Sequence, residues 1–91
     1  FSNKLTEFPS VVLELKNLKR LNIGANEISN LPDNIGILKQ LEYLSLTLTN
    51  VTTLPESMIG MEKLYIDDSQ NLKEKVPESY KHLFMYDKKK L

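Results

Sequence analysis

Hydrophobic positions recur along the chain at a period of about 23 residues, and each period combines two different spacings. In residues 18–40 the first spacing alternates, with Leu21 and Ile23 apolar, which is typical of a short β-strand with one buried face. The second spacing follows a Leu-Pro step at Leu31 and Pro32, where proline fixes φ and favours a 3₁₀ or short helical turn. Each period therefore predicts a strand and a helical return.

The same unit follows in residues 41–63, and part of it, without a strand, precedes residue 18. The matched pairs are Leu18 with Leu41, Leu21 with Leu44, Ile23 with Leu46, Ile28 with Val51, Leu31 with Leu54, Pro32 with Pro55, Ile35 with Met58, and Leu38 with Met61. Each unit is expected to bury its apolar face only against its neighbours. The residues expected to be fully buried are Leu21, Ile23, Leu44, Leu46 and Leu54.

The motif LxxLxLxxNxL, followed by LPxxIxxL, resembles the leucine-rich repeat family. In the second repeat it consists of Leu18, Leu21, Ile23, Asn26, Ile28, Leu31, Pro32, Ile35 and Leu38. The resemblance implies an α/β fold, a short right-handed solenoid arc of about four repeats with a parallel inner sheet and a 3₁₀ or short helical convex side. The chain would be a single domain, 1–91, with a partial repeat at about 1–17, repeats at 18–40, 41–62 and 63–85, and a tail at 86–91.

The asparagine of the motif is expected to be structural, because it turns the chain out of the strand and bonds backbone groups that the bend leaves buried. Asn3, Asn26 and Asn71 hold this place in the first, second and fourth repeats. The third repeat has Thr49 there, followed by Asn50. The asparagines of successive repeats are expected to form a ladder of hydrogen bonds along the stack. A hydroxyl forms fewer hydrogen bonds than an amide, so we predict that this ladder is weakened or locally shifted at Thr49.

The fourth repeat departs from the pattern and permits two alignments. The first, which we favour, uses Val76 and Pro77 as the Leu-Pro step and places Ile66 and Asp68 at the two core positions of the strand. The second takes Leu64 and Ile66 as those positions, but it leaves two extra residues before the step. A buried aspartate costs several kcal/mol unless it faces solvent, so both alignments indicate that the stack ends here.

The residues after Pro77 predict a short helix that caps the last repeat. Tyr80, Leu83 and Phe84 lie at spacings of three and four, which places them in one apolar stripe. The tail at Lys88, Lys89 and Lys90 is too short and too charged to be ordered by itself.

Composition and single residues point away from catalysis and from several partner classes. Lys plus Arg equals Asp plus Glu at 12 each, so no nucleic-acid partner is expected, and no apolar run approaches the roughly 20 residues that insertion into a membrane needs. There is no cysteine, the single His82 has no motif partner, and adjacent Asp67 and Asp68 would point to opposite faces of a strand. We therefore expect no catalytic residue, metal or cofactor. The start at Phe1 and the family resemblance favour a trimmed, secreted or cell-surface protein.

The concave face of the predicted sheet is the remaining candidate site. It is lined by Arg20, Asn22, Tyr43, Ser45, Thr47, Tyr65 and Asp67. Tyrosine and arginine are favoured anchors in protein interfaces. The alternative is a merely solvated face whose tyrosines serve strand formation. Leu48, near the end of the second strand, is expected to be an exposed leucine on either interpretation.

The resemblance implies protein binding, and we predict a non-enzymatic interaction module that binds a protein partner through the concave face. Its repeats look like those common in bacterial proteins, so the partner would be a host protein if the source is a pathogen. The alternative is a structural or self-assembling repeat protein, because Leu5, Phe8 and Val12 would expose the flank of the first repeat and favour a homodimer. Enzymes of this family carry a separate catalytic domain, for which 91 residues leave no room.

Overall fold

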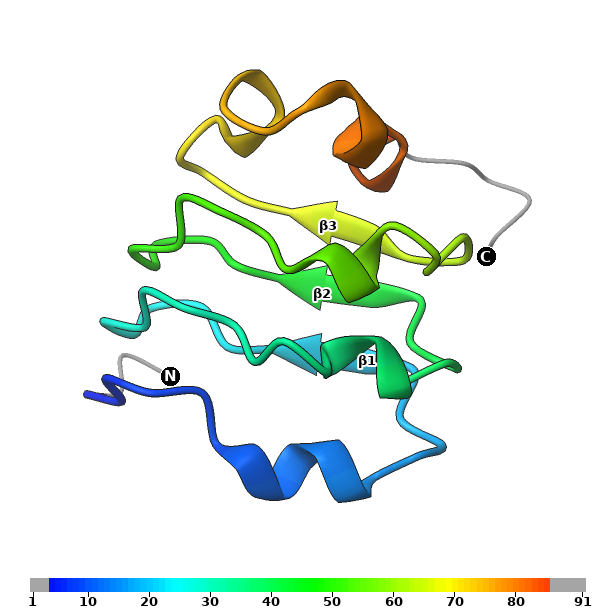
Figure 1. Ribbon diagram of the computed structural model, residues 1–91. Coiled ribbons are helices and arrows are strands. Elements are labelled where there is room, and N and C mark those ends of the chain that lie inside the picture. Colours follow the sequence, from blue (N-terminus) through cyan, green and yellow to red (C-terminus); the bar gives the residue numbers. More distant parts are fainter. Residues whose placement is uncertain (1–3, 86–91) are drawn as a thin grey trace.

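Residues 4–85, the part of the chain that the computed structural model describes, contain three short parallel strands and five 3₁₀ helices, which place the protein in the α/β class (Figure 1). The strands are β1 (Arg20–Asn22), β2 (Tyr43–Ser45) and β3 (Tyr65–Asp67), in the order β1-β2-β3. The helices are η1 (Ser10–Glu14), η2 (Ile35–Ile37), η3 (Glu56–Met58), η4 (Leu72–Glu74) and η5 (Glu78–Phe84). Residues 4–85 contain no α-helix, as expected from the short turns after each Leu-Pro step.

The sequence period sets the strand register. Leu44 pairs with Leu21 on one side and with Ile66 on the other, so each strand residue lies beside its equivalent in the neighbouring period. The pairing of Ile66 with Leu44 confirms the favoured alignment of the fourth repeat. Asp68 then falls at a core position of the motif, but it is only half-buried, and its Oδ2 accepts a hydrogen bond of 2.8 Å from the backbone N–H of Leu72. The carboxylate therefore begins the η4 turn instead of entering the core.

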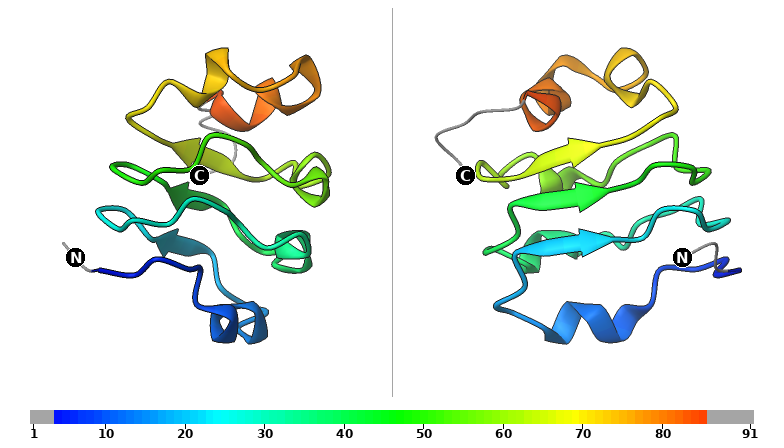
Figure 2. Two further views of the ribbon diagram at one scale, coloured as in Figure 1. Left: turned by 60° about the vertical axis from the view of Figure 1, so that its left-hand side comes forward. Right: turned by 180° about the vertical axis from the view of Figure 1, so that it is seen from behind.

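The helical segments η1, η2 and η3 lie one above another on one side of the sheet (Figure 2). The apolar residues of the strands and turns meet between these two layers. The largest fully buried side chains are Ile28, Ile35, Leu38, Leu41, Leu44, Leu46, Met58, Leu64, Ile66, Leu72, Leu83 and Val51. Burial of Ile23, Leu44, Leu46 and Leu54 is confirmed, but full burial of Leu21 was a wrong prediction, because β1 lies at the end of the sheet and Leu21 is half-buried.

Asn26 performs the predicted structural role. Its Nδ2 donates hydrogen bonds to the carbonyl oxygens of Ile23 and Gly24 at 2.9 and 3.0 Å. Its Oδ1 accepts a bond of 3.1 Å from the backbone N–H of Leu5, which fastens the first described residues to the second repeat. Asn3, the first member of the predicted ladder, lies outside the described residues.

Asn71 does not continue the ladder, contrary to the sequence prediction. The left-handed residue of each turn comes four positions after Leu21 and Leu44, at Ala25 and Leu48, but five after Ile66, so it falls on Asn71 itself. Asn71 has φ 60° and is exposed, because this conformation turns its side chain away from the core.

Gln70 takes the place of Asn71. Its Nε2 donates to Thr49 Oγ1 at 2.9 Å and to the carbonyl oxygens of Leu46 and Val51 at 3.2 and 3.3 Å. The Thr49 hydroxyl itself donates to the Leu46 carbonyl at 2.7 Å. The ladder is thus shifted at Thr49, as predicted, and the missing amide is supplied by the next repeat.

The predicted C-terminal cap is present as the 3₁₀ helix η5. Tyr80 and Leu83 are buried and Phe84 is half-buried against the core, and η5 packs on β3 and η4. His82 Nε2 lies 3.0 Å from the carbonyl oxygen of Ile59, so the only histidine of the chain links η5 to the turn after η3. The lysine tail, 88–90, lies outside the described residues.

Candidate functional site

The sheet has an open face, which consists of the strand residues that point away from the helical layer. Because Leu21, Leu44 and Ile66 point into the core, their neighbours on each strand point to the opposite side. The open face therefore carries Arg20, Asn22, Tyr43, Ser45, Tyr65 and Asp67. No helix of residues 4–85 covers it in Figure 2.

The parallel register aligns Arg20, Tyr43 and Tyr65 in a row across the three strands. The guanidinium carbon of Arg20 lies 4.4 Å from the centre of the Tyr43 ring, which is a cation–π contact. The Tyr43 and Tyr65 rings have centroids 6.3 Å apart and are tilted by 35°, within the range of favourable aromatic pairs. We call these three residues the aromatic row. Each side chain restrains the next, so the row is a pre-ordered surface.

A hydrogen bond fixes the centre of the aromatic row. The Tyr43 hydroxyl donates to Asp67 Oδ2 at 2.9 Å. Burial of the phenol and this bond to Asp67 raise the pKa of Tyr43 above its ordinary value near 10. The Tyr43 hydroxyl is thus a protonated donor at neutral pH, and its bond to Asp67 links β2 to β3 across the open face.

Ser45, Thr47 and Asn22 also form hydrogen bonds within the chain. Ser45 is only 5% exposed, because β2 is flanked by a strand on each side, so little of its surface is accessible to a partner. Its Oγ donates to Thr47 Oγ1 at 3.3 Å. Asn22 is exposed, and its Oδ1 accepts the backbone N–H of Gly24 at 2.8 Å, so part of its hydrogen-bonding capacity is used within the chain.

A shallow hollow of about 170 Å³ adjoins the open face. It is lined by Asn22, Gly24, Ala25, Ser45, Thr47 and Leu48. A Cβ atom at Gly24 would lie only 2.7 Å from the carbonyl oxygen of Thr47, so the close approach of the two turns requires glycine. Leu48 stands on the rim, 68% exposed, as the sequence led us to expect. Sequence reasoning missed its left-handed backbone, with φ 62°.

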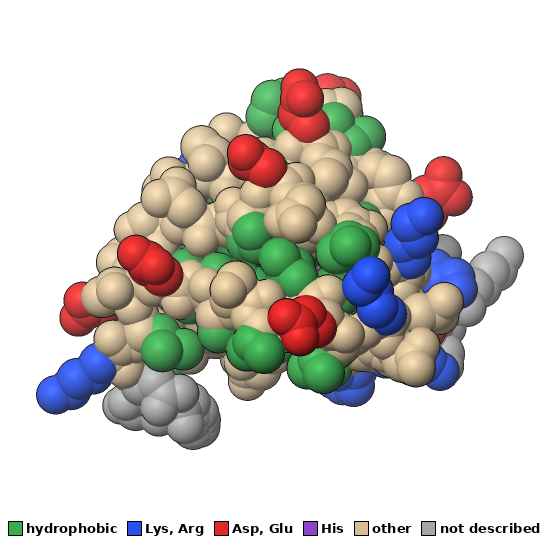
Figure 3. All heavy atoms as spheres, turned by 60° about the horizontal axis from the view of Figure 1, so that its bottom comes forward, with side chains coloured by type: hydrophobic (Ala, Val, Ile, Leu, Met, Phe, Trp, Pro, Cys, Tyr) green, Lys and Arg blue, Asp and Glu red, His purple; other side chains and the backbone are tan. Residues whose placement is uncertain are grey.

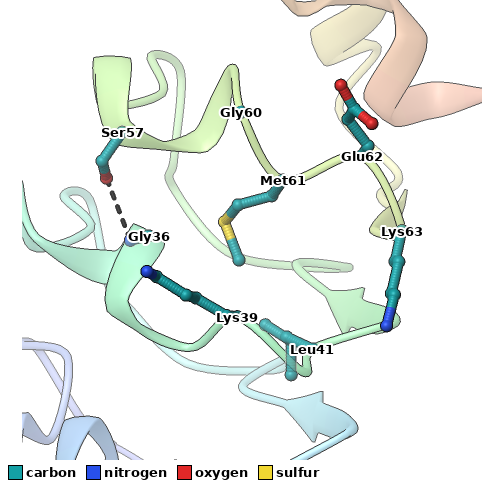
Figure 4. Close-up of a pocket in the computed structure, with 8 residues that line it drawn as sticks. All are labelled: Gly36, Lys39, Leu41, Ser57, Gly60, Met61, Glu62 and Lys63. Carbon is teal, nitrogen blue, oxygen red and sulfur yellow. Dashed lines mark hydrogen bonds between the residues drawn. The ribbon is translucent and has the colours of Figure 1, made fainter.

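A larger hollow, of about 430 Å³, lies on the helical side between the turns of η2 and η3 (Figure 4). It is lined by Gly36, Lys39, Leu41, Ser57, Gly60, Met61, Glu62 and Lys63, where Gly36 and Gly60 contribute no side chain. Ser57 Oγ accepts the backbone N–H of Gly36 at 3.0 Å and joins the two turns. Sequence reasoning missed this hollow, for which the two glycines were the only signal.

The N-terminal end carries the residues predicted for self-association. Leu5 is 41% exposed, whereas Phe8 and Val12 are half-buried and pack against the core. The Leu5 carbonyl accepts the backbone N–H of Glu27 at 2.9 Å, so this segment continues the stack below β1. Leu5 is thus the most accessible of the three residues.

The described part of the chain holds no cluster of three or more histidine, aspartate or glutamate side chains that could bind a metal ion. None of the helices in residues 4–85 combines the length and apolar character needed to cross a membrane. Comparison with known proteins found no family model and no curated protein that matches this chain.

Proposed function

We propose that the chain is a leucine-rich repeat solenoid that acts as a non-enzymatic protein-binding module, with the open face as its concave binding surface. Parallel strands whose paired residues are one sequence period apart support the repeat architecture. The turns after each strand also follow a common plan: the Glu27 N–H bonds the Leu5 carbonyl, and the Asn50 N–H bonds the Ile28 carbonyl one period later.

The aromatic row is the observation that carries the proposal. Arg20, Tyr43 and Tyr65 come from three different strands and stack into one continuous surface. Arginine and tyrosine are enriched among the residues that contribute most to protein–protein affinity. Because these side chains are already ordered by one another, a partner would lose little additional conformational entropy on binding them.

Two charged residues, on the β1 and β3 sides of the open face, define the partner further. Arg20 is exposed at the β1 side, and Asp67 lies at the β3 side with its Oδ2 bonded to Tyr43. A complementary protein surface would therefore place an acidic group near Arg20, an apolar or aromatic group over the rings, and a donor near Asp67.

A comparative capture experiment tests the proposal. Immobilised wild-type chain, the Tyr43→Ala Tyr65→Ala variant, and a control with Lys39→Ala and Lys63→Ala are incubated with the same extract, and bound proteins are quantified by mass spectrometry. The control removes charges from the hollow on the helical side without touching the open face. All three chains are checked by thermal melting, since both tyrosine rings lie outside the core.

We expect a protein that binds the wild type and the lysine control equally and is lost with the tyrosine variant. The melting curve of the tyrosine variant should remain close to that of the wild type. Capture that survives the tyrosine substitutions but disappears with the lysine substitutions would transfer the binding site to the helical side and would refute the proposal.

A further inference from the structure

The outer edge of β1 presents backbone groups that have no strand partner among residues 4–85. The Lys19 carbonyl accepts the Tyr43 N–H at 3.1 Å, and the Ile23 N–H donates to the Ser45 carbonyl at 3.2 Å, so alternate residues of this segment face β2. Arg20 and Asn22 therefore direct their backbone N–H and C=O groups to the other side. No strand within residues 4–85 pairs with that side, which leaves a template for another strand.

Apolar side chains gather at the same end of the molecule. Figure 3 shows them in the centre of the N-terminal end. Equivalent positions of the sequence period differ sharply in exposure: Leu15 is 54% exposed, whereas Leu38, one period later, is 0% exposed. Leu21 is likewise half-buried, whereas Leu44 is fully buried. These side chains lack the neighbouring layer that covers their equivalents.

The C-terminal end of a second copy is not available to cover the N-terminal end. Leu72 and Leu83 are fully buried where η4 and η5 lie beyond β3 (Figure 1). A head-to-tail stack of copies would need the outer edge of β3, over which these helices lie. A two-fold arrangement uses only the N-terminal end of each copy, because the same surface contributes to both sides of the interface.

We propose that two copies of the chain pair through β1 in antiparallel orientation about a two-fold axis, which forms one continuous six-stranded sheet. The axis lies beside Leu21, so that Leu21 is opposite Leu21 of the partner subunit on the apolar face. Arg20 then exchanges backbone hydrogen bonds with Asn22 of the partner subunit, and the same pairing occurs once more by symmetry. A register centred on Arg20 is disfavoured, because like charges would be directly opposite.

The N-terminal end has a basic side and an acidic side, so two copies related by a two-fold axis can present complementary charges to each other. Exposed side chains near the start of β1 are mainly basic. Those near the end of β1 are mainly acidic, and they come both from the turn after β1 and from the first described residues, which pack on that turn. The basic side has Lys16, Lys19 and Arg20 with Glu14, and the acidic side has Glu7 and Glu27 with Lys4. In an antiparallel pair the start of one β1 lies against the end of the other, so the basic side of each copy meets the acidic side of its partner.

The arrangement also joins the two open faces. A two-fold axis perpendicular to the sheet keeps both aromatic rows on the same side. A partner that carries two copies of its epitope would then bind with an increased effective concentration at the second site. This consequence rests on the proposed function, whereas the dimer itself does not.

Sedimentation velocity over a concentration series tests the dimer. We expect the wild type to form a dimer and Leu15→Glu to raise its dissociation constant by at least about tenfold, because a carboxylate would be buried in the interface. The matched control is Met85→Glu, which changes a residue of 60% exposure at the other end. A wild type that stays monomeric throughout, or equal effects of the two substitutions, would overturn the proposal.

Cysteine cross-linking tests the register. The chain has no cysteine, so Leu21→Cys introduces a single thiol opposite its own copy, at a Cα separation of about 4.5 Å that permits a disulfide. Mild oxidation should give a covalent dimer, whereas Leu48→Cys, at an exposed site away from β1, should remain a single chain. Equal cross-linking of both would show a non-specific contact and refute the register.

If Leu21→Cys lowers folding, which circular dichroism will show, a mixture of Arg20→Cys and Asn22→Cys chains replaces it. Both residues are exposed, and the register places each opposite the other. The mixed disulfide should then exceed the two self-linked products. A random distribution of the three products would contradict the pairing.

Discussion

The two ends of the sheet differ in how their last layer is covered. At the C-terminal end, η5 buries Tyr80 and Leu83 against the fourth repeat, and Asp68 and Lys81 bond backbone groups of the same segment. At the N-terminal end, η1 contains no buried residue, and Leu15 remains exposed. The comparison shows that the burial of a side chain in this sheet depends on the neighbouring layer more than on the residue type.

The largest effect expected from this comparison concerns the core leucines. Leu46→Ala should lower the free energy of unfolding by about 2–5 kcal/mol, because Leu46 is fully buried and the substitution leaves a cavity. Leu21→Ala should cost less than half as much, since its site at the end of the sheet is already half-open. Urea denaturation at a concentration where the chain is monomeric measures both. Equal losses would contradict the difference between centre and end.

The polar ladder should give the next effect. Asn26→Ala leaves the carbonyl groups of Ile23 and Gly24 without a buried donor and should cost about 1–3 kcal/mol. Gln70→Ala should cost less, because Thr49 keeps its own bond to the Leu46 carbonyl. Asn50→Ala is the matched control at an exposed position and should remain within about 0.5 kcal/mol of wild type.

Thermal or urea unfolding of these three variants tests the ladder. An Asn50→Ala loss as large as that of Asn26→Ala would show that the third turn is held by Asn50 instead of by Thr49 and Gln70.

Substitutions at the residues with left-handed backbone should change stability less, and one of them should increase it. Leu48→Asn should raise stability by about 1 kcal/mol, because left-handed φ costs a leucine more than an asparagine. Asn71→Leu, the converse change one period later, should lower stability by a similar amount. Calorimetric melting of the two variants provides the check, and a stabilising effect of Asn71→Leu would show that this turn is not left-handed.

The smallest expected effect is a pH dependence from Tyr43. Its pKa is raised in the folded protein, so the unfolded chain ionises first as the pH increases above about 10. The stabilisation is fully present below that pH and is lost as the pH rises through the folded-state pKa. When the free energy of unfolding is plotted against pH between neutral and alkaline values, its decrease with pH should therefore be smaller in Tyr43→Phe than in the wild type. An unchanged slope would contradict the raised pKa of Tyr43, which is caused first by burial of the phenol and then by the bond to Asp67.

The sequence predicted the strand register and the turns because these depend on a regular spacing that every repeat shares. It failed where a residue's environment depends on its place in the sheet, since Leu21 is half-buried at the end of the sheet instead of fully buried. It also failed at Asn71, where one additional residue between β3 and the turn moved the left-handed conformation onto the ladder position. The hydrophobic pattern changes at the same turn, since Leu72 follows Ile66 by six residues, whereas Val51 follows Leu44 by seven.

The alignment of the aromatic row was predictable from the sequence, since parallel pairing places Arg20 beside Tyr43 and Tyr43 beside Tyr65. The tilt of the rings and the bond to Asp67 were not, because they depend on side-chain packing across neighbouring strands. The hollow between η2 and η3 was missed for a similar reason, since it arises from the packing of two separate turns. Binding of a protein partner through the concave face remains a proposal.

Amide hydrogen exchange followed by NMR tests the central claim most directly, namely that β1 is an open edge of a parallel stack. At low concentration we predict slow exchange at Leu21, Ile23 and Ala25, which face β2, and fast exchange at Arg20 and Asn22, which face outward. Raising the concentration should slow Arg20 and Asn22 and leave the other three unchanged. Uniform exchange along residues 20–25 at every concentration would contradict both the register and the open edge.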